Sequence, residues 1–234
     1  MSFRSVLKEI TKFIGRYPSD TLSPSQNATR IYINKKSNKA AFSRVKNKGL
    51  FVRTWKQNTT APFASNWSSI CWSPELKLFV AISSGSVNIM RSNDGIIWYN
   101  TTTGVTSSTW SSVCWSSELN LFVAISYGSA NTMRSSDGIT WVNLDNSTTT
   151  PYNGVTSANW QSVCWSPELG IFVAVSYGSV NTMRSSDGIT WTNITSGVVS
   201  ANWSSLCWSS ELGLFSAISY GSVNTMRSLS LKEY

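Results

Sequence analysis

The chain has 234 residues, of which 41% are hydrophobic and 12% aromatic, and its formal net charge is +8. This length is enough for one sizeable core, and the absence of histidine removes the commonest general base and metal ligand of proteins. The sequence predicts no membrane span, because no apolar stretch approaches the required length. It also predicts no secretory signal, because the apolar residues near the N-terminus are periodic and not contiguous.

The first part of the chain is strongly basic. Residues 1–56 hold 13 of the 19 lysines and arginines, but only Glu9 and Asp20 among the acidic residues. Apolar residues recur at helical spacing over about 3–14, which predicts an amphipathic helix ended by Gly15 and Pro18. We expect irregular structure from there to residue 48, so residues 1–48 form a basic arm.

This basic arm is expected to anchor the chain. Its partner is the ring that follows, other subunits of a larger assembly, an acidic protein surface, or nucleic acid contacted through residues 1–56. An organelle-targeting peptide is a further interpretation. Contact with nucleic acid would be electrostatic and salt-sensitive, because no aromatic-interleaved recognition motif is present. The basic residues predicted to make these contacts are Arg4, Lys8, Lys12, Arg16, Lys35, Lys36 and Lys39.

Residues 49–234 consist of four near-copies of one unit. A cysteine marks the same place in each copy: Cys71, Cys114, Cys164 and Cys207. Repeats of this length are typical of propellers and related arrays. The first unit predicts four short strands, at 67–72, 78–83, 87–91 and 96–99, separated by turns rich in Gly, Asn, Asp and Ser. Four antiparallel strands per repeat correspond to one propeller blade.

The last unit lacks its fourth strand, and a matching segment lies before the first unit. Trp55 precedes Trp67 by the same twelve residues that separate Trp191 from Trp203. The sequence therefore predicts an all-β, four-bladed β-propeller whose last blade is closed by an N-terminal strand at residues 50–57. Closure would remove the exposed sheet edges. A ring completed by a second chain is the alternative.

The turn before each fourth strand carries a recognisable motif. The sequence SSDGITW occurs at 135–141 and at 185–191, and SNDGIIW at 92–98 is a weaker copy. These segments resemble the Asp-box of sialidase-like β-propellers in a shortened form, similar to repeats in virus and phage proteins. The resemblance implies a propeller fold and a turn-forming role for the motif. It implies little about activity.

The cysteines are interpreted as small buried packing residues. Each is predicted to lie mid-strand in a different blade, so symmetry separates them around the ring, whereas a disulfide needs Cα atoms within about 7 Å. Without histidine, no metal site or cofactor is expected.

An arginine follows each cysteine by twenty residues. The four arginines are Arg91, Arg134, Arg184 and Arg227. Because they repeat, we expect a structural role, such as pairing with the repeated Glu75, Glu118, Glu168 and Glu211 or with the turn aspartates. The alternative is a ring of arginines that lines the channel and holds an anion. No unique pair of carboxylates and no singular Tyr/Glu pair is present, so the sequence predicts no catalytic residue and no enzyme.

Tyrosines mark the predicted binding face. In an up-and-down blade, the connections from second to third strand and from fourth strand to the next blade lie on one face. The tyrosines expected there are Tyr127, Tyr177, Tyr220 and Tyr152. Tyrosine, serine and asparagine suit contacts with proteins or glycans.

The sequence thus predicts a non-enzymatic interaction or assembly module. We expect a virion structural protein (minor capsid, tail or fibre) or an intracellular assembly component, anchored by the basic arm. A glycan-binding lectin-like propeller is the first alternative, and a sialidase-like glycoside hydrolase is the second.

Overall fold

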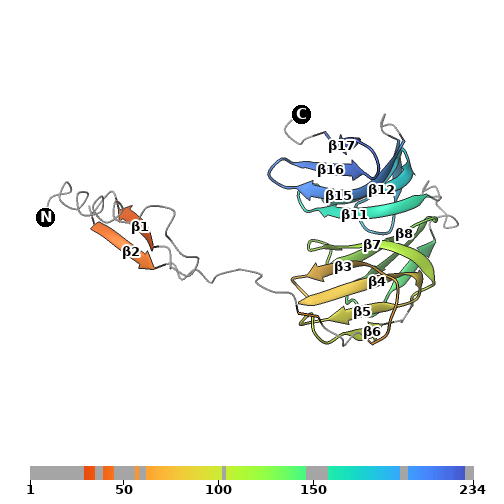
Figure 1. The fold of residues 1–234 in the computed structure, drawn as a ribbon, viewed down its shortest axis with the longest axis horizontal. Coiled ribbons are helices and arrows are strands. Elements are labelled where there is room, and N and C mark those ends of the chain that lie inside the picture. Colours follow the sequence, from red (N-terminus) through yellow and green to blue (C-terminus); the bar gives the residue numbers. More distant parts are fainter. Residues whose placement is uncertain are drawn as a thin grey trace. The chain divides into compact units, whose positions relative to one another are not determined.

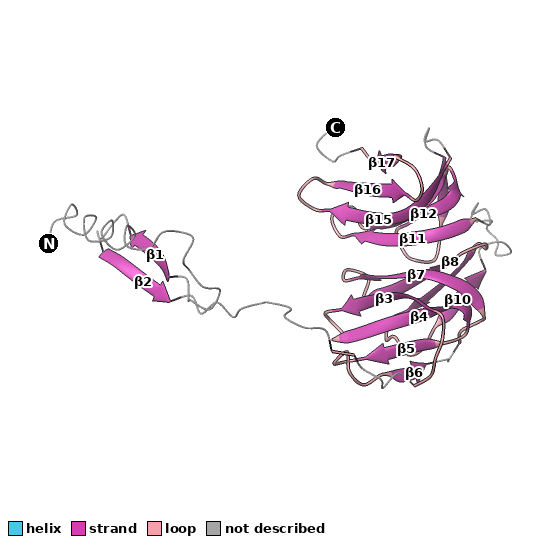
Figure 2. Cartoon of the chain, in the orientation of Figure 1, coloured by secondary structure: helices cyan, strands magenta, loops and turns pink. Residues whose placement is uncertain are grey.

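The computed structural model of the chain describes residues 29–34, 39–44, 56–57, 62–101, 104–145, 158–195 and 200–229. These residues form strands and connecting loops and include no helix (Figure 2). The chain divides into two compact units, Met1–Gln57 and Asn58–Tyr234. The helix predicted at about 3–14 lies outside the described residues.

The basic arm is not irregular throughout. Strand β1 (Thr29–Asn34) pairs antiparallel with β2 (Lys39–Arg44), with Ile31 opposite Phe42 and Ile33 opposite Ala40. Apolar and β-branched residues alternate along both segments, which is the pattern of a half-buried strand. These residues are therefore extended. Lys39 begins β2; the other basic residues predicted to make contacts lie outside the described part.

The described strands of the second unit fall into four modules of the same design. Module 1 contains β3 (Trp67–Ser73), β4 (Leu78–Ser86), β5 (Ile89–Ser92) and β6 (Tyr99–Thr101). Module 2 contains β7 (Ser108–Ser116), β8 (Leu121–Ser126), β9 (Asn131–Ser135) and β10 (Val142–Asp145). Module 3 contains β11 (Asn159–Ser166), β12 (Ile171–Ser179), β13 (Asn181–Ser185) and β14 (Thr192–Thr195). Module 4 contains β15 (Ala201–Ser209), β16 (Leu214–Ser219) and β17 (Thr225–Arg227). The modules follow one another from one end of the unit to the other (Figure 1).

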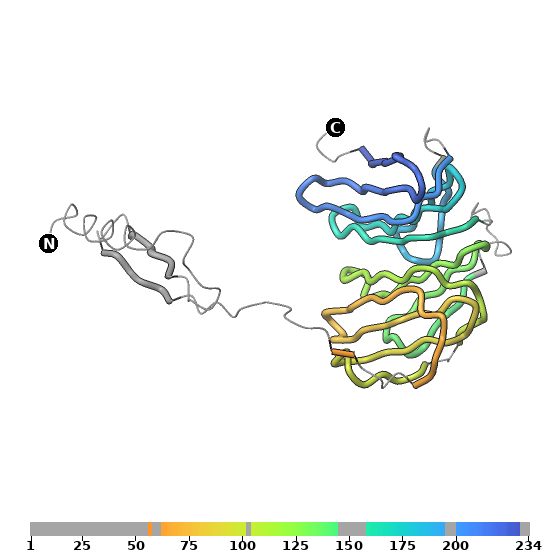
Figure 3. The backbone as a smooth tube through the Cα atoms, viewed as in Figure 1, coloured from red at the N-terminus to blue at the C-terminus, as the bar shows by residue number. Residues whose placement is uncertain are grey.

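Each module is an antiparallel meander, and the meanders join in pairs. The end of β4 pairs with β7, and the end of β12 pairs with β15. The result is an eight-stranded sheet from modules 1 and 2 and a seven-stranded sheet from modules 3 and 4. The backbone trace shows how strongly these sheets curl (Figure 3). The all-β prediction is confirmed for the described residues.

The core lies between consecutive modules. Val80 and Ile82 of β4 are fully buried against Trp110, Val113 and Trp141 of module 2. The same cluster recurs one module later. The second strand of module 2, β8, is apolar at successive positions, because it has one module on each side and is buried on both faces. Module-to-module packing therefore supplies most of the apolar burial.

The aspartate turn fixes the start of the fourth strand. Oδ1 of Asp137 accepts hydrogen bonds from the backbone N–H groups of Ile139 (2.7 Å) and Thr140 (2.8 Å) and from the Ser135 hydroxyl (2.9 Å). Partial burial raises the pKa of Asp137, but these donors lower it by more, so the pKa lies below its usual value. Gly138 has φ 69°, and a Cβ atom there would lie 2.6 Å from Cδ2 of Leu78 in module 1. The turn thus also fits closely against the preceding module.

The same turn in module 1 explains why the fourth strand begins later than predicted. The first three strands of module 1 begin within two residues of their predicted positions, but β6 begins at Tyr99 and not at residue 96. The N–H groups of Ile96 and Ile97 donate to Oδ1 of Asp94 at 2.8 and 2.9 Å. They are therefore committed to the turn and cannot pair with a strand.

The two ends of the array remain apart in the described residues. The first strands of neighbouring modules pack side by side, β3 with β7, β7 with β11 and β11 with β15, whereas β3 and β15 form no comparable contact. The strand predicted at 50–57 lies outside the described residues except for Lys56 and Gln57, which are exposed and belong to no strand. Closure of the ring by this segment stays a prediction.

Candidate interaction surface

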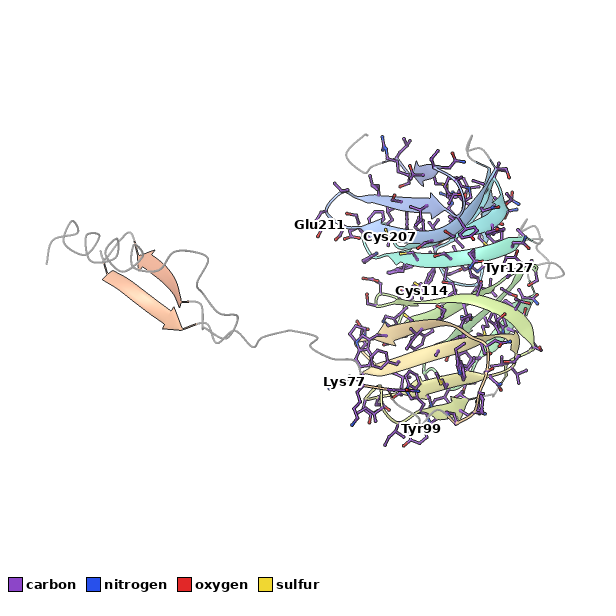
Figure 4. The ribbon with its side chains drawn as sticks, viewed as in Figure 1. Lys77, Tyr99, Cys114, Tyr127, Cys207 and Glu211 are labelled. Atoms are coloured by element: carbon purple, nitrogen blue, oxygen red, sulfur yellow. The ribbon has the colours of Figure 1, made fainter. Side chains whose placement is uncertain are left out.

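The connections from second to third strand lie at one edge of the modules. Tyr127 is at the side opposite to Lys77 and Glu211, which lie in turns between first and second strands (Figure 4). Tyr177 and Tyr220 occupy the same place in modules 3 and 4, where Ser84 stands in module 1. We call this edge the tyrosine edge.

The structure brings two of the predicted tyrosines together. The rings of Tyr127 and Tyr177 have centroids 6.5 Å apart and are tilted by 51°. Both side chains are half-buried, and the backbone N–H of Tyr127 donates to the carbonyl of Thr109 in the first strand of the same module (2.8 Å). Tyr220 is 70% exposed. Tyr152 lies outside the described residues.

A polar hollow of about 310 Å³ lies beside Tyr220. It is formed where the end of module 3 meets the start and the last loop of module 4. Its lining includes Gly178, Ser200, Asn202, Tyr220, Ser222 and Asn224. The Ser200 hydroxyl, just before module 4, donates to the Gly178 carbonyl of module 3 (3.2 Å), and within module 4 the Tyr220 N–H donates to the Asn202 carbonyl (2.8 Å). Hydroxyl, amide and phenol groups are thus gathered around one recess.

The serines and asparagines of this hollow were not predicted as site residues. Asn202 belongs to the repeated Asn-Trp pair also present at Asn66 and Asn159, directly before the buried tryptophan of the first strand. That repetition was the sequence signal by which these asparagines could have been singled out. The sequence does not show that the segments of Asn202 and Tyr220 lie side by side, so it could not predict the hollow.

The repeated arginines lie on the third strand of each module. These strands are β5, β9, β13 and β17, and the arginines stand opposite residues of the second strand such as Val80 and Val123. The first strands are the ones that pack together from module to module, so the arginines are two strands away from that row. Arg184 is exposed, and Arg91 lies over the Tyr99 ring of its own module, 5.7 Å from the centroid. The anion site stays a prediction.

Three of the four repeated glutamates bind indoles. Oε2 of Glu75 accepts a hydrogen bond from Trp115 Nε1 (2.7 Å), and Oε2 of Glu118 accepts one from Trp165 Nε1 (2.6 Å). Glu168 and Trp208 make the third such bond (2.6 Å). In each case the glutamate belongs to one module and the tryptophan to the next. The repeated carboxylate thus ties neighbouring modules together.

The cysteines lie on the first strands, but they are less buried and closer together than expected. Cys71, Cys114 and Cys164 are half-buried free thiols, and Cys207 is exposed. Burial raises the pKa of Cys71 to about 11. Burial also raises the pKa of Cys114 well above its usual value, with smaller contributions from the Cys71 and Cys164 thiols. Symmetry therefore does not keep these thiols far apart, because the first strands form a contiguous row.

Two further observations concern the described residues alone. They contain no group of three or more Cys, Asp or Glu side chains placed to hold a metal ion. They also contain no helix long and apolar enough to cross a membrane.

Comparison with known proteins supports the fold. No protein-family model matches the chain, and no curated protein matches it. Virginiamycin B lyase from Staphylococcus aureus matches over 86% of this chain and 60% of its own, at 12% identity and a TM-score of 0.57. YCF48 from Cyanidioschyzon merolae matches over 75% of this chain and 56% of its own, at 16% identity and a TM-score of 0.54.

A nidogen/laminin complex gives a third match, over 86% of this chain and 70% of that one, at 11% identity and a TM-score of 0.53. These neighbours are β-propellers. The chain spans about 60% of the length of the lyase. At these identities the likeness defines a propeller-like fold and not an activity.

The prediction that this fold carries no enzyme is corrected by the same matches. Virginiamycin B lyase and a streptogramin B lyase, the latter at 8% identity and a TM-score of 0.51, are enzymes with this architecture. Paired carboxylates and a Tyr/Glu pair are features of sialidase-like hydrolases, so their absence from the sequence does not bear on a lyase.

Proposed function

We propose that the chain is a protein-interaction module and that the tyrosine edge is its contact surface. The observation that carries the proposal is the cluster at this edge: the Tyr127–Tyr177 ring pair, the 70% exposed Tyr220, and a polar hollow beside it. Tyrosine is enriched in protein interfaces, because it buries a large rigid side chain and still offers a hydrogen-bonding group. The modules hold these groups on a strand framework, so little order would be lost on binding.

Two of the structural neighbours support a protein partner. One solved structure is YCF48 bound to D1 peptide, and another is the nidogen/laminin complex. These partners belong to those proteins, and the present proposal takes from them only the use of a propeller for protein contacts. The role as a virion or assembly component, with residues 1–48 as the anchor and residues 50–57 as a completing fourth strand, is proposed on the sequence alone.

The test is a quantitative binding comparison at the tyrosine edge. Immobilised wild-type chain and its Tyr177→Ala and Tyr220→Ala variants are exposed to extract of the source cells, and bound proteins are measured by mass spectrometry. Tyr99→Ala is the matched control, because Tyr99 is 53% exposed but lies on the fourth strand β6. We expect the edge variants to lose the same partner and the control to keep it. Equal capture by all four proteins would remove the proposal.

Glycan binding is the second candidate, favoured by the polar hollow beside Tyr220. Hydroxyl and amide groups next to an aromatic ring can hydrogen-bond and stack on a sugar. A glycan array with the same variants separates the two candidates: a specific glycan lost with Tyr220→Ala supports the lectin interpretation, and an empty array removes it.

A further inference from the structure

Tyrosine and asparagine residues alternate along the tyrosine edge. Tyr177 of β12 has two direct antiparallel partners, Asn159 of β11 on one side and Asn202 of β15 on the other. Residues directly opposite each other in antiparallel strands lie on the same face of the sheet, with Cβ atoms about 4.5–5.5 Å apart. The alternation continues beyond this group, because the Tyr220 N–H donates to the Asn202 carbonyl and the Tyr127 ring contacts the Tyr177 ring.

The two asparagines lie at the junctions between modules. A Cβ atom on Gly128 would lie 4.0 Å from Oδ1 of Asn159, and one on Gly178 would lie 3.9 Å from Oδ1 of Asn202. Each asparagine side chain therefore approaches the loop that follows a tyrosine of the preceding module. We call the five residues the Tyr/Asn row; their spatial order is Tyr127, Asn159, Tyr177, Asn202 and Tyr220.

The side-chain amides of this row are available to a ligand. Asn159 and Asn202 are half-buried, and within the part of the chain that the structure describes their side-chain amides have no hydrogen-bond partner. Asn202 also lines the polar hollow beside Tyr220. A ligand that supplies both a donor and an acceptor to such an amide would replace the hydrogen bonds to water that half-burial restricts.

The loops between second and third strands hold the row in place. In each loop a serine Oγ accepts the backbone N–H of the asparagine two residues later. The distances are 3.1 Å for Ser86 and Asn88, 3.2 Å for Ser129 and Asn131, 3.1 Å for Ser179 and Asn181, and 3.1 Å for Ser222 and Asn224. One closed turn thus recurs in all four modules, so little conformational freedom would be lost on binding.

An extended polypeptide matches the chemistry and the length of the row. A side-chain amide carries a donor and an acceptor in one plane, as a peptide group does, so each asparagine can bond a peptide group of the ligand. Neighbouring strands lie about 4.8 Å apart, so the five positions span roughly 19 Å, the length of about six extended residues. The loops at 84–88, 127–131, 177–181 and 220–224 contain no charged residue, which favours an uncharged segment.

A glycan matches the row less well. Tyr127 and Tyr177 are half-buried, and their rings are tilted against each other by 51° at a centroid distance of 6.5 Å. Each ring therefore covers part of the other, whereas a sugar that stacks on tyrosine needs an open ring face. The amide groups between the rings are the part of the row that is left for a ligand.

We propose that the tyrosine edge binds its partner through an extended, uncharged polypeptide segment that lies along the Tyr/Asn row. The amides of Asn159 and Asn202 bond peptide groups of this segment, and the tyrosine rings pack against its side chains. This inference rests on the proposed function, because it states the form in which a protein partner binds the same surface. Since the main chain is bound, segments with different side chains are accepted.

The test uses linear peptides selected by phage display on the immobilised full chain. Phage that also bind the double variant Asn159→Leu/Asn202→Leu are removed, because leucine resembles asparagine in size but has no donor or acceptor. Fluorescence anisotropy of the enriched peptides should show binding to the wild type, weakened about tenfold or more in each single leucine variant. Asn100→Leu is the matched control, since Asn100 is exposed on the fourth strand β6, and it should bind like the wild type.

Methylation of single peptide nitrogens tests main-chain recognition. It removes one N–H donor from the ligand and leaves its side chains unchanged. At the contacted positions it should weaken binding to the wild type about tenfold, with little further effect on the matching leucine variant. If a leucine variant does not fold, as judged by far-UV circular dichroism, the aspartate variant at that position takes its place, because it keeps the size and lacks the amide donor.

Three results would overturn the inference: no peptide enriched over the double variant, methylated peptides that bind wild type and variants with equal losses, or a glycan-array signal that depends on Asn202 while no peptide binds. Capture of a cellular partner that depends on Tyr177 and Tyr220 but on neither asparagine would remove this inference and leave the proposed function standing. Capture that depends on none of these residues would remove both.

Discussion

Replacing the fourth-strand tryptophan should cost far more in module 3 than in module 1. Trp191 is 0% exposed and packs in one cluster with Leu121 and Val123 of the preceding module. Trp98, its counterpart in module 1, is only half-buried, because no module precedes it in the chain. Both rings contact the phenylalanine of their own module at nearly the same centroid distance, 6.2 Å for Trp191 and 6.3 Å for Trp98. The difference between the two positions therefore isolates the contribution of the neighbouring module.

The magnitude follows from the buried area. A tryptophan buries about 150–250 Å², which at about 25 cal/mol per Å² corresponds to roughly 4–6 kcal/mol, and truncation to alanine in a core typically costs about 3–5 kcal/mol. We expect Trp191→Ala to lower the free energy of unfolding by about 4 kcal/mol and Trp98→Ala by about half as much. The contact with the phenylalanine, worth about 1 kcal/mol, is lost in both variants.

Urea denaturation followed by far-UV circular dichroism measures both losses. Equal losses at the two positions would refute the reasoning, since they would mean that each tryptophan is buried by its own module alone.

Three further predictions follow from the same contacts. Glu118→Ala should lower the free energy of unfolding by about 1–3 kcal/mol, because it leaves the buried Trp165 indole N–H without an acceptor. Glu118→Gln keeps an acceptor, so its melting temperature should lie within a few degrees of that of the wild type. Hydrogen bonds hold the pKa values of Asp137 and Asp187 below normal. The stability that these carboxylates contribute is therefore complete above the unfolded pKa of about 3.9 and is lost as pH falls through the folded pKa values. The variant with asparagine at both positions should lose less melting temperature between about pH 5 and pH 2 than the wild type, and an equal loss would contradict this. Iodoacetamide should modify the exposed Cys207 before Cys114, whose pKa is raised by burial; peptide mass spectrometry of a time course measures the order, and modification of Cys114 first would contradict this.

The strand pattern was predictable because it depends on local chemistry. The alternation in WSSICWS, the apolar run of LFVAIS and the Asn-Asp-Gly turn each specify an element without reference to distant residues. The hairpin of β1 and β2 was missed because its strands lie within a segment dominated by Lys, Asn and Ser. Here the alternation of Ile31 and Ile33 outweighs the polar composition of the segment.

The partners of the repeated polar residues could not be predicted in the same way. Glutamate and arginine repeat in every unit, so charge alone favours pairing them. Glu75 and Glu118 instead accept hydrogen bonds from indole N–H groups of the next module. Only the register between modules decides this, and nothing within one repeat encodes it. The tyrosine edge was within reach of the sequence, because it follows from the order of strands in an antiparallel meander.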